Sequence, residues 1–166
     1  MFSRPLRRVV CALFLACVSN SALIHAEEPD KIEDLAPDEA RGKAIYATGR
    51  GAGGRPLQFR LLTAGERALP ASGIFCASCH GADGKGGREG NIVLADITYA
   101  TLSRPLPASP PWNKARAAYT DVLLARAITQ GLDSSGQQLD GSMPRWLLSE
   151  SELQDLLKYL RRLGGR

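Results

Sequence analysis

The chain has 166 residues, a formal net charge of +4 and 44% hydrophobic residues, which is enough for one domain with a core but short for two. Residues 1–26 carry three arginines and no acidic residue, so 21 minus 3 basic residues against 17 acidic ones leaves +1 for residues 27–166. A nearly neutral chain gives no compositional support for nucleic-acid binding.

Residues 1–26 have the pattern of an export signal. A short stretch with three arginines precedes an apolar run from Val9 to Val18, and a region of polar and small residues follows as far as Ala26. We predict cleavage after Ala26. The apolar run is too short for a membrane span, which needs about 20 residues in a helix. We therefore expect a periplasmic protein with no membrane-spanning segment, in which residues 27–166 form a single domain.

Cys17 allows an alternative at this end of the chain. Residues 14–17, Phe-Leu-Ala-Cys, loosely match the box that precedes a lipidated cysteine in bacterial lipoproteins, although Phe14 is unusual at its position. A form with a lipid anchor at Cys17 is therefore a second prediction.

Residues 37–49 predict the first helix after the signal. Pro37 suits the first turn of a helix, and Asp38 and Glu39 complement the positive end of the helix dipole. The segment 49–73 that follows is a long approach to the next motif, and residues 57–62 are expected to form a short strand within it.

The sequence FCASCHGADGKGG at residues 75–87 contains Cys76, Cys79 and His80. Cys-x-x-Cys-His is the spacing of covalent haem attachment, in which two thiols add to the haem vinyl groups and the histidine binds the iron. Residues three apart share one face of a helix, so both sulfurs can reach the same porphyrin edge. We predict one haem c bound by these three residues.

Zinc and dithiol chemistry are the competing interpretations of this motif. A structural zinc site needs four nitrogen or sulfur ligands, and beyond residue 26 the chain has no cysteine or histidine outside the motif. A thioredoxin-like dithiol follows a strand in a βαβ unit, whereas this one lies between a loop and a glycine-rich run. Both readings are less favoured than haem.

The region after the motif predicts a loop and then a helix. Residues 104–114 are rich in proline and read as an extended surface loop. A helix is expected over residues 121–130, with Thr120 as its N-cap and Gly131 just beyond its end. We expect this helix to form a wall of the haem pocket through Val122, Leu123, Arg126 and Ile128.

Met143 is the only methionine after residue 26. Ligation by two histidines is excluded because the mature chain has one, which leaves histidine with methionine, or histidine with lysine, water or nothing. Met143 stands between Gly141 and Pro144, at a turn that could present its thioether inward. We predict His80 and Met143 as the iron ligands, and we predict no catalytic residue.

Residues 149–163 predict the last helix. Ser149 and Glu152 form a capping box. Leucines then recur with the 3.6-residue period of an amphipathic helix; they are Leu153, Leu156, Leu157 and Leu160.

The CASCH motif with its trailing GADGKGG, the helices at 37–49 and 149–163, and the MPRW sequence around Met143 together resemble the class I c-type cytochromes over about residues 37–163. The resemblance implies an all-α fold of three to four helices and loops around one covalently bound haem. In that family the terminal helices cross at close range, with a small residue facing an aromatic one; Gly42 and Tyr159 match these positions.

One position departs from the family. Many members have a proline after the motif whose carbonyl accepts the Nδ1 proton of the haem histidine, and this chain has Ala95 there. Any backbone carbonyl can act as this acceptor, so the sequence leaves its identity open.

The resemblance implies an electron carrier, not an enzyme. Single electrons would pass by outer-sphere transfer between a redox protein donor and an acceptor. Two alternatives remain: a haem-bearing subunit of a periplasmic dehydrogenase or oxidase, and a haem sensor or enzyme with an open distal site. Arg55, Arg145 and Trp146 are candidates for holding the haem propionates, although surface or core positions explain them equally well.

Overall fold

The computed structural model describes residues 35–65, 67–90, 92–108 and 115–164. The predicted export signal, its cleavage point and Cys17 lie outside the described residues, as does part of the predicted loop, residues 109–114. All described residues fall in one compact unit, Lys31–Arg166. None of the helices in these ranges is long and apolar enough to cross a membrane.

The two terminal helices form where local signals predict them. Helix α1 spans Pro37–Thr48 and ends at Gly49, which adopts the left-handed conformation with φ 65°. Helix α5 spans Glu150–Arg162, and the hydroxyl of Ser149 accepts a hydrogen bond from the backbone N–H of Glu152. Both predicted helices are therefore confirmed to within a residue at each end.

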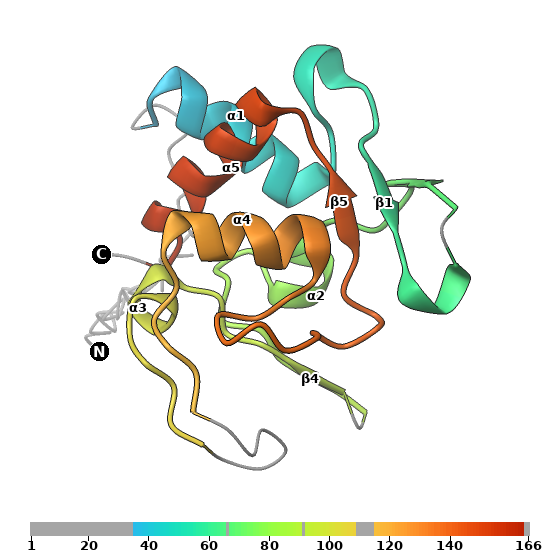
Figure 1. The fold of residues 1–166 in the computed structure, drawn as a ribbon. Coiled ribbons are helices and arrows are strands. Elements are labelled where there is room, and N and C mark those ends of the chain that lie inside the picture. The colour runs from blue at the N-terminus through green and yellow to red at the C-terminus, as the bar shows by residue number, and fades with distance from the viewer. Residues whose placement is uncertain (1–34, 66, 91, 109–114, 165–166) are drawn as a thin grey trace, which may run out of the picture. The chain divides into compact units, whose positions relative to one another are not determined.

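Helices α1 and α5 lie side by side (Figure 1). Gly42 is a point of close approach between them. A Cβ atom on Gly42 would lie 2.7 Å from the carbonyl carbon of Asp155 and 2.8 Å from Cβ of Tyr159, closer than Cβ atoms pack. The rings of Tyr46 and Tyr159 meet beside this point, with their centroids 5.4 Å apart. The small residue and the aromatic residue thus face each other as expected.

Ion pairs line the outer edges of this helix pair. They join the first turns of α1 to the middle and the end of α5, so they favour the crossed arrangement, although exposed pairs contribute little energy individually. The pairs are Asp38 with Lys158 at 2.5 Å, Glu39 with Arg162 at 2.9 Å, and Arg41 with Asp155 at 2.6 Å.

Short strands accompany the helices, so the predicted all-α class holds only in part. Strand β1 (Gln58–Arg60) lies between β2 (Leu69–Pro70) and β5 (Arg145–Leu147), both antiparallel to it. A second antiparallel pair joins β3 (Gly87–Glu89) to β4 (Ile92–Leu94). These strands have two or three residues, too few to show the alternation by which a strand is recognised in sequence. The strand expected within 57–62 is confirmed.

Helix α4 (Asp121–Gln130) begins and ends as predicted. The Thr120 side chain accepts from the backbone N–H of Leu123, and Gly131 closes the helix with φ 70°. The buried face consists of Leu124, Ala127 and Ile128. Val122 is 77% exposed and does not belong to this buried face; the pocket wall itself stays a prediction. Two short helices, α2 (Cys76–His80) and α3 (Tyr99–Leu102), and two 3₁₀ turns at Ala52–Gly54 and Leu62–Ala64 complete the described elements.

Glu152 connects α5 to the loop that precedes β1. Its side chain is 5% exposed and accepts from the backbone N–H and hydroxyl of Ser149, from the N–H of Ala52, and from the guanidinium of Arg55 at 2.8 Å. Burial raises the pKa of Glu152, but the hydrogen bonds from Ser149 and Ala52 and the charge of Arg55 outweigh burial, so the pKa is lowered overall. The ionised carboxylate therefore stabilises the fold.

Replacing Gly42 by alanine should destabilise the protein by about 1–3 kcal/mol because the methyl group forces α1 away from α5. At an exposed helix position the same replacement should stabilise the protein, since alanine is more favourable than glycine in a helix by about 0.5–1 kcal/mol. Urea unfolding of Gly42→Ala measures the difference. Ala44→Val, on the exposed side of α1, is the control for a larger side chain. A gain in stability for Gly42→Ala would contradict the close crossing.

Replacing Glu152 by glutamine should lower the free energy of unfolding at pH 7 by about 1–3 kcal/mol, since hydrogen bonds to a charged group are lost. A carboxyl group whose pKa is lowered by folding stabilises the native state above its unfolded pKa, and this stabilisation is lost as the pH falls through the folded value. The difference between wild type and Glu152→Gln should therefore shrink below about pH 4. Glu150→Gln, exposed on the same helix, should show neither effect; a pH-independent difference would exclude ionised Glu152 as the cause.

Candidate functional site

The Cys-x-x-Cys-His motif forms α2, a helix of five residues. Phe75 precedes it in an extended conformation, and the hydroxyl of Ser78 donates to the Phe75 carbonyl at 2.6 Å. Neither cysteine forms a disulfide: Cys76 is partly buried and Cys79 is exposed. Because α2 is one helical turn, Cys76 and Cys79 lie on the same side of it.

The environment of Cys76 argues against the dithiol interpretation. Its side chain packs against the hydrophobic core, and burial raises the pKa of the thiol to about 12. Redox-active cysteines require a lowered pKa, since the thiolate is the reactive species. Cys76 has the opposite property.

His80 is oriented by a backbone carbonyl. Its Nδ1 lies 2.8 Å from the carbonyl oxygen of Ala95, and because a carbonyl can only accept, Nδ1 carries the proton and donates it. Burial lowers the pKa of His80, while the hydrogen bond to Ala95 opposes this shift. The ring is therefore neutral at pH 7, and Nε2 keeps its lone pair for a metal. The acceptor that the sequence left open is Ala95.

Gly86 leaves room for the Ala95 carbonyl because it has no side chain. The backbone N–H of Gly86 donates to the His80 carbonyl at 2.8 Å, and Gly86 then leads into the β3–β4 pair, where Gly87 lies opposite Leu94. A Cβ atom on Gly86 would lie 2.6 Å from the Ala95 oxygen and 2.7 Å from its carbonyl carbon. The two segments therefore touch backbone to backbone beside the histidine.

The loop that follows the motif contacts α1 and the residue just beyond α5. The hydroxyl of Tyr46, on α1, donates to the carbonyl of Gly81 at 2.6 Å, directly after His80. A Cβ on Gly84 would lie 2.8 Å from Cγ of Leu163, beyond the end of α5. The loop after the motif is thus packed against both helices.

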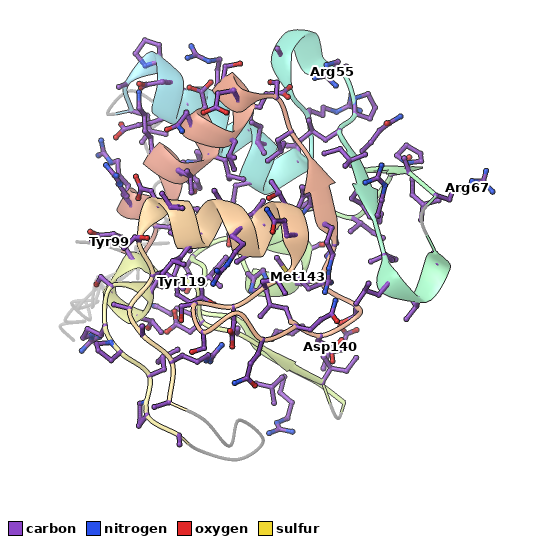
Figure 2. The ribbon with its side chains drawn as sticks, in the orientation of Figure 1. Arg55, Arg67, Tyr99, Tyr119, Asp140 and Met143 are labelled. Carbon is purple, nitrogen blue, oxygen red and sulfur yellow. The ribbon has the colours of Figure 1, made fainter. Side chains whose placement is uncertain are left out.

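Met143 lies on the loop between α4 and β5, together with Asp140 (Figure 2). The Asp140 carboxylate accepts from the backbone N–H of Ser142 at 2.8 Å, and the Met143 N–H donates to the Asp140 carbonyl at 3.1 Å. The Met143 side chain is partly buried. The turn expected around this residue is therefore present.

The three candidates for propionate binding have different surroundings. Arg55 forms an ion pair with Glu152 and lies at the turn before β1 (Figure 2). Trp146 is 4% exposed and packs against Phe59, with ring centroids 5.3 Å apart. Arg145 is 6% exposed, and its guanidinium lies among the backbone carbonyls of the Met143 loop.

Two buried guanidinium nitrogens have no hydrogen-bond partner among the described residues. They are Nε of Arg126, on α4, and Nε of Arg145, on β5. Arg126 otherwise donates to the Asp133 carbonyl at 2.6 Å. A buried charged donor without a partner is costly, so Nε of Arg126 suits an anionic group from outside the chain. Nε of Arg145 lies against Gly131, at the end of α4. The sequence predicted Arg126 only as part of a pocket wall. The signal that could have identified it as an anion ligand is its position as a cation in a helix that was expected to face the haem.

The donors suit a haem better than a bare metal ion. Among the described residues, no three histidine, cysteine or acidic side chains are close enough together to hold a metal, which counts against zinc. A cysteine pair on one helix turn, a histidine with a free Nε2, a thioether and an incompletely paired arginine fit a porphyrin with its vinyl groups, iron and carboxylates.

The sequence comparison agrees with this donor set. A family model described as Cytochrome c matches residues 39–164, and the chain belongs to this family, resembling its class I c-type members. The family implies covalently bound haem c, and its members are typically electron carriers. Neither the curated proteins nor the solved structures gave a significant match.

Replacing Gly86 by alanine should displace the Ala95 carbonyl and weaken its hydrogen bond to His80. Hydrogen exchange of the Nδ1 proton, followed by NMR on the reduced protein with its haem, should then become at least about tenfold faster, which corresponds to about 1.4 kcal/mol. Gly90→Ala is the matched control, since Gly90 also has a positive φ of 57° but no atom within 4 Å of the added Cβ. Equal exchange in wild type and Gly86→Ala would show that this contact does not hold the acceptor.

Proposed function

We propose that the mature protein is an exported, monohaem c-type cytochrome that carries single electrons between two redox proteins by outer-sphere transfer. The observation that carries the proposal is the arrangement of His80: its Nδ1 is fixed on Ala95 at 2.8 Å, which leaves Nε2 for iron next to a cysteine pair. Membership of the cytochrome c family supports the same function.

Each site residue has a distinct role in this proposal. Cys76 and Cys79 would hold the haem through thioether bonds, and His80 and Met143 would be the iron ligands. The hydrogen bond from His80 to Ala95 keeps the imidazole in one orientation and increases its basicity. Arg126 offers its unpaired Nε atom to a haem propionate.

Haem c, when bound, supplies an iron that takes up and releases one electron without making a bond to substrate. The chain tunes that process in two ways. As an iron ligand, the soft thioether of Met143 would favour the reduced state, and burial of the haem among apolar side chains would act in the same direction. A high reduction potential for a cytochrome is therefore expected.

The alternatives differ in what occupies the distal face or binds the surface. An open-site sensor or enzyme would need a distal acid or base, and the mature chain has no histidine other than His80. A subunit of a periplasmic dehydrogenase or oxidase would use the same ligands and differ in its affinity for a partner. The proposal also includes export to the periplasm, with cleavage after Ala26 or lipidation at Cys17, which the sequence pattern of residues 1–26 supports. A redox protein donor and a redox protein acceptor are part of it as well, because an electron carrier needs both.

Optical spectra of the purified mature protein, oxidised and reduced, test the proposal. We expect a covalently attached haem and a weak near-infrared band from iron–sulfur ligation. The band should disappear in Met143→Ala and persist in Ser142→Ala, which alters the same turn but keeps the thioether. Absence of covalent haem would overturn the proposal; haem without the band, together with ready carbon monoxide binding, would favour the open-site alternative.

A further inference from the structure

Arg145 folds its side chain back over the loop that carries Met143. Its Nη1 donates to the carbonyl oxygens of Asp140, at 2.9 Å, and of Met143, and its Nη2 donates to the Leu139 carbonyl at 3.1 Å. One guanidinium group thus binds three carbonyls of this loop, including that of the predicted iron ligand itself.

The guanidinium is enclosed on its other side by the end of α4. A Cβ atom on Gly131, the residue that closes α4, would lie 2.5 Å from Nη2 of Arg145. The side chain is 6% exposed overall. It therefore occupies a fixed space between the end of the helix and the loop, and the glycine is what provides the room.

The backbone of Arg145 belongs to a different element from the loop that its side chain binds. It pairs with Arg60 in the antiparallel register of β1 and β5, and the neighbouring Trp146 is buried against Phe59. The loop is thus fastened through Arg145 to the sheet. Within the described ranges, the hydrogen-bond partners of the guanidinium are all neutral backbone carbonyl oxygens, and Arg145 forms no ion pair.

We infer that Arg145 is a positioning residue for Met143, which holds the loop 139–143 in the conformation that keeps the thioether on the iron. This inference rests on the proposed function. Lysine cannot replace arginine in this role, because a single ammonium group cannot reach three carbonyls with the planar, forked geometry of a guanidinium.

The consequence is a change in the equilibrium between bound and released thioether. When a competing ligand binds only the released form, its apparent affinity rises in proportion to the population of that form. We call the contacts of Arg145 with the three loop carbonyls the clamp. Loss of the clamp should let added imidazole displace Met143 from the ferric iron more readily, while the fold and the covalent haem remain.

Imidazole titration of the ferric holoprotein, monitored by loss of the near-infrared band, measures this equilibrium. We expect apparent imidazole affinity to rise at least about tenfold in Arg145→Lys. Gly131→Ala should show the same direction, because its methyl group expels the guanidinium. Far-UV circular dichroism and urea unfolding of each variant establish that it is folded.

Two matched controls separate the clamp from general destabilisation. Gly136 has a φ of 80° and no atom within 4 Å of an added Cβ. Gly136→Ala therefore strains the connection between α4 and β5 without touching Arg145. Arg60→Lys makes the same exchange at the position opposite in the strand register. Both should keep imidazole affinity within about twofold of wild type.

Each result decides the inference. A wild-type band with unchanged imidazole affinity in folded Arg145→Lys overturns the clamp and leaves the proposed function standing. A rise of equal size in both controls also overturns it. Absence of the band in the wild-type protein overturns the clamp together with ligation by Met143.

Discussion

The close approach of α1 to α5 at Gly42 is the constraint on which the site depends. A side chain there would meet the backbone of Asp155 and Cβ of Tyr159, so the two helices can lie in contact only because residue 42 has none. The contact brings Tyr46 against Tyr159 and its hydroxyl to the carbonyl of Gly81. The histidine motif is thereby fixed to the helix pair.

The buried charged groups differ in how completely the chain supplies their hydrogen-bond partners. The chain itself satisfies the carboxylate of Glu152, with donors from Ser149, Ala52 and Arg55. Arg126 and Arg145 each keep a buried nitrogen without a partner among the described residues. A fold with incompletely paired guanidinium groups in its interior gains stability when an anion enters. The propionates of the proposed haem would provide that anion, so binding of the cofactor and completion of the fold would reinforce each other.

Local signals account for the parts of the fold that the sequence predicted correctly. Thr120 and Gly131 bound α4, and Ser149 with Glu152 starts α5, because a cap satisfies backbone groups within one turn and needs no distant partner. Val122 shows the limit: its place on a helix was predictable, but its exposure depends on which neighbours the helix meets. The strands were mostly missed because two or three residues are too few to show alternation, and the pairing of β1 with β5 joins segments far apart in the chain.

The sequence by itself predicted the haem motif and the candidate donors, since the spacing of Cys76, Cys79 and His80 and the single methionine after residue 26 are properties of the chain. It also predicted the three long helices, α4 and α5 through their caps and α1 through Pro37 and the acidic residues that follow it. Tertiary structure alone decided that Ala95 accepts from His80, that Gly86 makes room for that carbonyl, and that Arg145 gathers the carbonyls around Met143. Backbone carbonyls are identical along the chain, so only the fold selects which of them reaches a given donor.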